Sequence, residues 1–163
     1  VTSVDQIVSA YQKALALDRS VLAEEFIAGK ELTCTIIERN GEAEVFPLIR
    51  IIAPNANYDY HNKYFGTDTQ YLCPCGLNEE LENTIQKYAL QGYHALGCRG
   101  WGRIDVMLRE NDNQPFLLEL HSSPGMTGHS LVPMAARQKG LSYEDLCVTL
   151  LSGATLDHIK HKV

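Results

Sequence analysis

Apolar residues recur along the chain in patterns that alternate between helical and extended spacing. The first segment has helical spacing, which predicts a helix over about residues 4–17. Segments rich in β-branched residues follow, separated by short polar turns, at 21–27, 32–40 and 43–53. The second of these segments ends in Asn40-Gly41, a pair that favours a two-residue hairpin. These segments predict an antiparallel meander.

The rest of the chain adds helices and a second hairpin. Asn78 can cap a helix whose apolar stripe ends at Gly97. The segments "WGRIDVML" and "PFLLEL" predict two strands joined by the polar turn "RENDNQ". Two further helices are predicted, the last of them capped by Ser142, over about 130–140 and 143–151. We therefore expect an α+β fold in which helices pack on an antiparallel sheet.

Residues 54–77 separate these two parts and show no sustained period. They contain Pro, Asn, Gly and Tyr residues rather than a helical or alternating pattern. A loop of this length inside a compact domain is uncommon and usually has a function. We therefore expect this segment to take part in a site.

Composition and charge narrow the class of partner. The chain has 163 residues, is 45% apolar, and carries 20 acidic against 14 basic residues for a net charge of −6. This balance argues against a nucleic-acid partner or an anionic membrane surface. No apolar run is long enough to span a bilayer, and the start lacks the pattern of a signal peptide. We expect a cytoplasmic protein whose five cysteines are reduced thiols.

The second hairpin brings candidate chemistry together. If its turn is centred near Asp112, Asp105 lies opposite Glu119 and Arg103 lies opposite His121, all on one face. Two opposed carboxylates repel, because their Cβ atoms are only about 5 Å apart. A divalent cation would relieve this repulsion, and Mg²⁺ suits hard oxygen ligands. An ion pair between Arg103 and Glu119, and a hydrogen-bonded core histidine at 121, remain as alternatives.

Longer motifs resemble a known family. "GWGRIDVML" followed by "SPGMTGHSLVPMAAR" resembles the C-terminal region of D-alanine-D-alanine ligases, which belong to the ATP-grasp superfamily. "VLAEEFIAGKELT" and "YDYHNKYFGTDTQYLCPCGL" match the same family in the same order. The resemblance implies that residues 1–53 are an incomplete part of the central ATP-grasp subdomain. It also implies that residues 54–163 form the C-terminal subdomain, with a mobile loop at 54–77.

The family likeness implies a reaction and its ligands. ATP phosphorylates the carboxylate of one D-alanine, and the amine of a second attacks the acylphosphate to give the D-alanyl-D-alanine of peptidoglycan. The expected ligands are ATP, D-alanine and two Mg²⁺ or Mn²⁺ ions. The full-length protein is expected to be a cytoplasmic homodimer.

The likeness also assigns roles residue by residue. The metal ligands are Asp105, Glu119 and His121. The tetrahedral intermediate is stabilised by Arg103 and the backbone N–H of Gly125, and the carboxylate of the second D-alanine is received by Ser130 and Leu131. The loop that closes over the site carries Lys63, which binds ATP, and Tyr64, a catalytic group. The remaining contacts to ATP come from Glu24, Glu25, Ile27, Glu31 and Leu118.

Two departures from the family pattern qualify these expectations. His121 stands where the family has Asn, and an imidazole nitrogen is a softer ligand better matched to Mn²⁺, Zn²⁺ or Co²⁺. Family members are also about twice as long, and the phosphate-gripping lysines and glycine-rich loop have no counterpart here. We therefore expect the 163-residue chain alone to be inactive and to be a piece of a longer protein. The alternatives are a non-catalytic nucleotide- or metal-binding fragment, a degenerate paralogue, or a related ligase with another acceptor.

Overall fold

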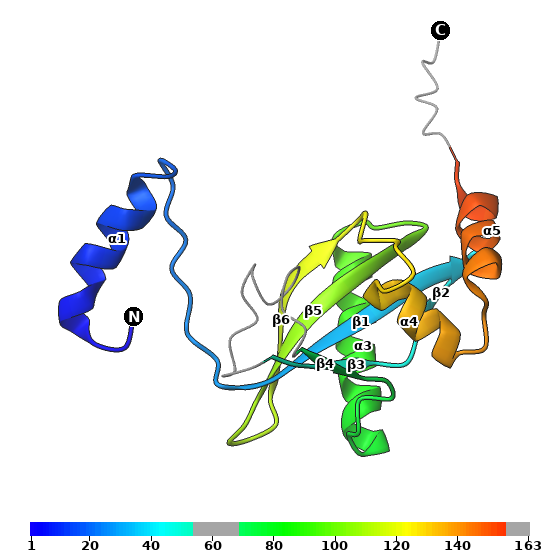
Figure 1. Ribbon diagram of the computed structural model, residues 1–163, viewed down its shortest axis with the longest axis horizontal. Coiled ribbons are helices and arrows are strands. Elements are labelled where there is room, and N and C mark those ends of the chain that lie inside the picture. Colours follow the sequence, from blue (N-terminus) through cyan, green and yellow to red (C-terminus); the bar gives the residue numbers. More distant parts are fainter. Residues whose placement is uncertain (54–68, 156–163) are drawn as a thin grey trace, which may run out of the picture.

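The computed structural model describes residues 1–53 and 69–155 (Figure 1). In chain order, its elements are η1 (Val4–Gln6), α1 (Ile7–Leu15), β1 (Gly29–Arg39), β2 (Glu42–Val45), β3 (Ile49–Ile52), β4 (Gln70–Leu72), α3 (Glu79–Ala95), β5 (Trp101–Arg109), β6 (Pro115–His121), α4 (Leu131–Gln138) and α5 (Tyr143–Gly153). The predicted α+β class is confirmed. No helix in the described ranges is long and apolar enough to cross a membrane.

The strands form one antiparallel sheet in the order β4-β3-β1-β5-β6. Both β2 and β3 pair with β1, opposite the edge that pairs with β5, and Pro47 lies between them. The predicted antiparallel pairing of 32–40 with 43–53 is confirmed, although the second segment is divided into β2 and β3, which follow one another along one edge of β1. Strand β1 is consequently paired on both sides for most of its length.

The strand predicted at 21–27 is wrong, because the structure, which describes this segment in full, shows an extended linker there. Both edges of β1 are already paired, so the segment has no strand beside it to join. Only toward its end is the linker anchored, where Ile27 is 8% exposed and the Glu110 N–H donates to the Ala28 carbonyl. Gly29 then approaches β5 so closely that a Cβ atom would lie 1.9 Å from the Leu108 carbonyl oxygen.

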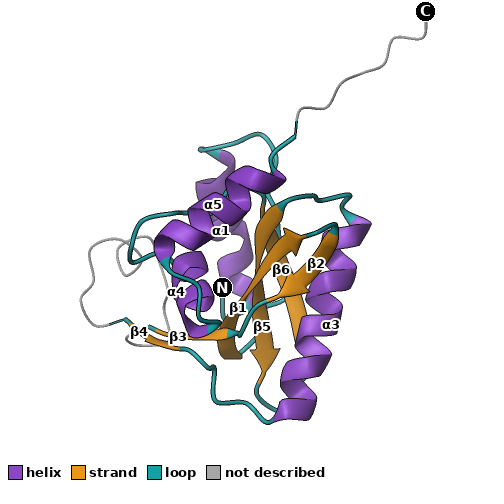
Figure 2. Cartoon of the chain, turned by 90° about the vertical axis from the view of Figure 1, so that its right-hand side faces the viewer, coloured by secondary structure: helices purple, strands orange, loops and turns teal. Residues whose placement is uncertain are grey.

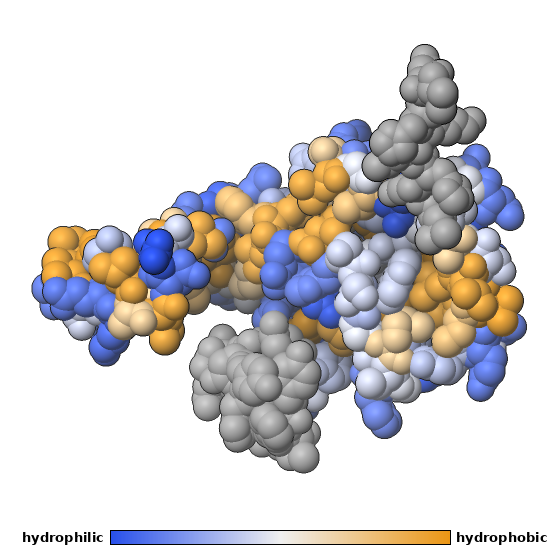
Figure 3. Space-filling view, turned by 90° about the horizontal axis from the view of Figure 1, so that it is seen from above, coloured by the Kyte–Doolittle hydropathy of each residue, from blue (hydrophilic) through white to orange (hydrophobic). Residues whose placement is uncertain are grey.

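Helix α1 lies at the far end of this linker and projects away from the sheet (Figure 1). None of its residues is buried. Large hydrophobic side chains are exposed on it and on the linker, among them Ile7, Val8, Tyr11, Leu15, Leu17, Leu22 and Phe26. Figure 3 shows orange patches over this end of the molecule. The predicted helix exists, but it begins as a 3-10 turn and ends at Leu15.

Helices cover the two faces of the sheet differently (Figure 2). On one face, α3 packs its buried Ile85, Ala89 and Tyr93 against alternate residues of β1 and β5. On the other face, α4 and α5 pack against a smaller cluster centred on Ile37 and Ile49. The second face is therefore closed by helices only over part of its area.

Local signals in the sequence place several helix ends and turns correctly. The Asn78 side chain accepts from the Leu81 N–H at 2.9 Å, and Ser142 accepts from the Asp145 N–H at 3.0 Å. Asn40 and Gly41 have φ of 55° and 82° in the predicted hairpin, which joins Arg39 to Glu42. Helix α3 is followed by Gly97 at φ 65°, a left-handed conformation that glycine adopts without strain.

The irregular segment predicted at 54–77 is interrupted by a short strand, and residues 73–77 are irregular as predicted. Residues 70–72 form β4, which pairs with β3, and residues 54–68 lie outside the described part of the chain. The sheet draws strands from both sides of residue 53, and the division into two subdomains at that point stays a prediction.

All five cysteines are free thiols, as predicted. Burial raises the pKa of Cys34 well above its ordinary value and that of Cys73 to about 11. Both thiols are therefore protonated at neutral pH and act as small apolar groups.

Candidate functional site: two carboxylates and an imidazole

The β5–β6 hairpin brings the predicted residues together. Asp105 lies opposite Glu119 and Arg103 lies opposite His121, as predicted. The simple hairpin assumed around Asp112 does not hold nearer the turn, because Val106 pairs with Leu117 and the register shifts between Asp105 and Val106. A β-bulge therefore absorbs one residue of β6 between the turn and the site.

This bulge determines which face Leu118 occupies. Leu117 and Leu120 both face α3, since Leu117 lies beside Gly92 and Leu120 packs on the core beneath that helix. Two residues lie between them instead of one, so Leu118 joins Glu119 on the opposite face. Leu118 has no cross-strand partner in the hairpin and is 49% exposed. An apolar surface therefore lies directly beside the carboxylate pair.

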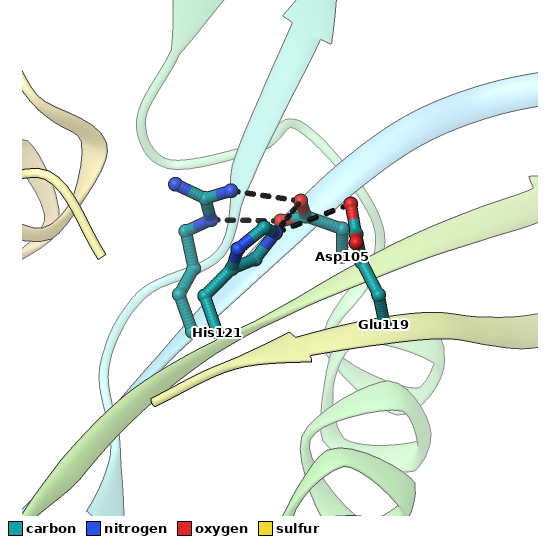
Figure 4. A network of polar contacts seen from close by, with 4 residues as sticks. Asp105, Glu119 and His121 are labelled. Carbon is teal, nitrogen blue, oxygen red and sulfur yellow. Dashed lines mark hydrogen bonds and ion pairs between the residues drawn. The ribbon is translucent and has the colours of Figure 1, made fainter. Parts of the chain in front are cut away.

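The polar groups form a connected network (Figure 4). Arg103 donates two parallel hydrogen bonds to Asp105, each 2.9 Å long. The His121 Nε2 atom lies 3.1 Å from Asp105 Oδ2 and 3.2 Å from Glu119 Oε1. Arg103 thus pairs with Asp105, and the alternative in which it neutralises Glu119 on the diagonal does not describe this site.

This arrangement fits a divalent cation in its donor chemistry. One atom from each of Asp105, Glu119 and His121 lies within 4.8 Å of the others. The two carboxylates and one guanidinium leave one negative charge when the imidazole is neutral. In the present contacts Nε2 must donate, because ionised carboxylates only accept. A cation would use the other tautomer, with the Nε2 lone pair directed between the two carboxylates.

Burial differs among the three candidate ligands. The side chain of Asp105 is 10% exposed, that of His121 33% and that of Glu119 58%. The site is therefore an open edge of the sheet with one ligand fixed inside it. Glu119 can turn toward a ligand without leaving solvent.

Two threonines beneath the site were missed in the sequence. Thr33 pairs across the sheet with Asp105, and Thr35 pairs with Arg103. Each threonine is 1% exposed, and each hydroxyl lacks a hydrogen-bond partner in the described part of the chain. An isolated Thr in an apolar strand gives no signal of this kind, because the strand register decides what it lies beside.

The Pro-Gly loop after β6 leads into α4, which begins at Leu131 as predicted. Ser130 has the extended backbone of an N-cap, but its hydroxyl bonds within the loop, 2.9 Å from Thr127 Oγ1. Gly125 packs against the same hydroxyl, and a Cβ atom there would lie 3.0 Å from it. The predicted substrate-contacting residues thus lie in one compact turn.

The candidate nucleotide-binding residues are more dispersed. Glu24 and Glu25 are exposed in the linker, where Glu25 lies 3.8 Å from the Arg109 guanidinium at the hairpin tip. Glu31 lies in β1 opposite Met107, on the same face as Asp105, two residues further along β5. Lys63 and Tyr64 lie outside the described residues. The roles assigned to all of these residues stay predictions.

Comparison with known proteins identifies the family of this chain. Residues 1–152 match the family model described as the D-ala D-ala ligase C-terminus. The D-alanine-D-alanine ligases of Cupriavidus taiwanensis and Ralstonia pickettii are 60% and 57% identical to 96% of the chain, which covers 48% and 47% of their lengths. The chain spans about half the length of the curated relatives it matches.

Solved structures agree with this match. The D-alanine-D-alanine ligase of Bacillus anthracis complexed with ATP has a TM-score of 0.76 at 28% identity, over 94% of this chain and 47% of that one. The D-Ala:D-Ser ligase VanG of Enterococcus faecalis also has a TM-score of 0.76 at 28% identity, over 92% of this chain and 43% of that one. By sequence and by fold, the chain belongs to the D-alanine-D-alanine ligase C-terminal family.

Proposed function

We propose that this chain is the ATP-binding and catalytic C-terminal portion of a D-alanine-D-alanine ligase. The observation that carries the proposal is the convergence of Asp105, Glu119 and His121 beside Arg103, in a chain about 60% identical to such ligases. The reaction is ATP plus two D-alanine to ADP, phosphate and D-alanyl-D-alanine, through an acylphosphate. Its product serves peptidoglycan synthesis in the cytoplasm, and the complete protein is a homodimer.

The residues of this chain act mainly by positioning and charge. Phosphoryl transfer needs little covalent work from a protein, so fixed opposite charges dominate. Mg²⁺ or Mn²⁺ held by Asp105 and Glu119 would neutralise charge on the phosphates. Arg103 and the Gly125 N–H stabilise the negative oxygen of the tetrahedral intermediate, where one lost donor typically costs about 3–4 kcal/mol. Ser130 and Leu131, at the start of α4, receive a substrate carboxylate at the positive end of the helix dipole.

The nucleotide lies along the open face of the hairpin in this proposal. Leu118 supports the adenine, Glu24, Glu25 and Ile27 contact its edge, and Glu31 binds the ribose. The exposed, apolar Leu118 next to Glu119 supports this arrangement, because the ribose links base and phosphates, so an apolar surface for the base must lie within one nucleotide's length of the metal ligands. Lys63 and Tyr64 are proposed to close over the phosphates.

His121 gives this site a different metal preference from an all-oxygen one. A neutral imidazole adds a nitrogen donor to the two carboxylates, and nitrogen favours Mn²⁺, Co²⁺ or Zn²⁺ relative to Mg²⁺. Calorimetry of Mn²⁺ and Mg²⁺ binding to the full-length protein, beside a His121→Asn variant, tests this without relying on turnover. We expect His121→Asn to lower the Mn²⁺ to Mg²⁺ affinity ratio, because it replaces a nitrogen donor by an amide oxygen. Equal ratios in the two proteins would remove His121 from the ligand set.

The principal test is D-alanine-dependent release of ADP by the full-length protein that carries this chain. We expect turnover in that protein, no turnover in the 163-residue chain alone, and none in full-length Asp105→Asn. Circular dichroism of the variant shows whether it has folded. A folded full-length protein without D-alanine-dependent ADP release would instead support the non-catalytic alternative.

A second candidate is a related ligase with another acceptor. The observation behind it is that the D-Ala:D-Ser ligase VanG and a D-alanine-D-alanine ligase match this chain with the same TM-score, so the fold does not distinguish the two acceptors. The assay above should therefore compare D-alanine, D-serine and D-lactate as the second substrate. A kcat/KM higher for D-serine or D-lactate than for D-alanine would change the assignment.

A further inference from the structure

The Pro-Gly loop, residues 122–130, is held partly by its own bonds. The Thr127 N–H donates to Ser130 Oγ at 3.0 Å, and the Ser130 N–H donates to the Thr127 carbonyl at 2.9 Å. These bonds close the turn between Thr127 and Ser130. They do not attach the preceding residues, Gly125 and Met126, to the rest of the molecule.

The Met126 side chain packs on the core cluster that contains Ile37 and Ile49, and two side chains outside the loop hold its backbone carbonyls. Arg137 of α4 donates to the Gly128 carbonyl at 3.3 Å, and Tyr143 of α5 donates to the Met126 carbonyl at 2.5 Å. The Tyr143 bond is the shorter one, and it reaches the residue that follows Gly125. Tyr143 therefore ties the Gly125 side of the loop to a different helix from the one that the loop enters.

Tyr143 is itself fixed. It is the first residue of α5, directly after Ser142, which exchanges two hydrogen bonds with Asp145 at 3.0 and 2.7 Å. One turn further, Leu146 is fully buried in the cluster that joins α4, α5 and the sheet. The phenol hydroxyl is thus presented by a capped and anchored helix end.

We propose that Tyr143 is a positioning residue, whose hydroxyl holds the Met126 carbonyl and thereby the Gly125 N–H and Ser130 in their working places. The inference rests on the proposed function. An oxyanion donor is effective only when it already points at the developing charge, so freedom in the loop reduces the rate. Tyr143 touches neither ATP nor D-alanine in this proposal and acts only through the loop.

The test is Tyr143→Phe in the full-length protein, which removes the hydroxyl and keeps the ring. One lost hydrogen bond of ordinary strength corresponds to about a 3- to 10-fold fall in kcat. The KM for D-alanine should rise and the KM for ATP should stay unchanged, because the adenine contacts lie elsewhere. Amide hydrogen exchange should become faster in residues 125–130 but not in α5.

The matched control is Tyr88→Phe. Tyr88 lies on α3, its side chain is exposed, and its hydroxyl has no partner in the described part of the chain. This variant should match the wild type in every measurement. Unchanged kcat and loop exchange in Tyr143→Phe would overturn the positioning role, as would equal changes in both KM values. An inactive wild type would refute the proposed function alone, because the exchange experiment still decides whether Tyr143 holds the loop.

Discussion

The two faces of the β5 strand differ although they share one backbone. Ile104, Val106 and Leu108 point to α3 and are at most 2% exposed. Arg103 and Asp105 alternate with them and point to the opposite face, where charged groups meet. Strand alternation thus separates the residues that hold the sheet together from those that do chemistry by a single position in the sequence.

The two faces contribute differently to the free energy of folding. The α3 face buries a continuous apolar cluster, which is the main source of stability. The opposite face buries the hydroxyls of Thr33 and Thr35 without partners and keeps Asp105 nearly buried beside another carboxylate. Each unpaired threonine hydroxyl costs about 1–3 kcal/mol, whereas the Asp105 carboxylate is compensated by its two hydrogen bonds from Arg103. We interpret the site face as stabilised by the other face of the same strands.

The largest expected effect is a loss of activity when a charged group on the site face is neutralised. Glu119→Gln removes one charge from the proposed metal site, and we expect turnover of the full-length protein to fall on the order of 10³-fold. Stability should change by less than about 1 kcal/mol, because Glu119 is more than half exposed and its contact with His121 is near the surface. Steady-state kinetics and urea unfolding measure the two quantities. A large loss of stability would break the separation between the faces.

Ile104 precedes Asp105 in β5 and points to the α3 face. Its substitution should change stability strongly and activity little. Ile104→Ala removes buried carbon atoms from the α3 face, and we expect the free energy of unfolding to fall by about 2–5 kcal/mol. The kcat per folded molecule should stay near the wild-type value, provided that the assay is run well below the unfolding transition. Urea unfolding monitored by circular dichroism gives the stability. A loss below about 1 kcal/mol would mean that this cluster is not the main core.

A smaller effect with the opposite sign is expected at Thr35. Val has nearly the same shape as Thr but lacks the hydroxyl, so Thr35→Val removes a buried group that has no partner among the described residues. We expect the free energy of unfolding to rise by about 1 kcal/mol. If the variant is instead less stable by thermal and urea unfolding, the Thr35 hydroxyl is satisfied in solution and its burial carries no such penalty.

The smallest effect tests how tightly the α3 face is packed. A Cβ atom at Gly92, within α3, would lie 3.0 Å from Leu117 Cδ1. Ala favours a helix over Gly by about 1 kcal/mol, and the partly exposed Leu117 side chain can move aside. We therefore expect Gly92→Ala to stabilise the protein by about 0.5 kcal/mol in thermal unfolding. A destabilised variant would show that Leu117 is fixed in its present rotamer.

The sequence predicted features that depend on nearby residues. The cap at Asn78, the hairpin at Asn40-Gly41 and the pairing of Asp105 with Glu119 each follow from a short segment, and each was correct. The strand at 21–27 was wrong, and β1, its expected partner, is paired on both edges with other strands. Three features could be recognised only in the folded structure: the unpaired hydroxyls of Thr33 and Thr35, the bulge at Leu118, and the hydrogen bond from Tyr143 to the Pro-Gly loop. Each depends on which strands and helices lie next to one another, which a short segment of sequence does not show.

The bulge in β6 also makes the hairpin tolerant of changes in length. Its extra residue, Leu118, lies between the turn and the carboxylate pair. One residue could therefore be deleted there without moving Glu119 away from Asp105. A chain with one residue fewer in this strand would restore regular pairing toward the turn and keep the same ligands in register. The hairpin tip can therefore vary in length during evolution or design while the site keeps its alignment.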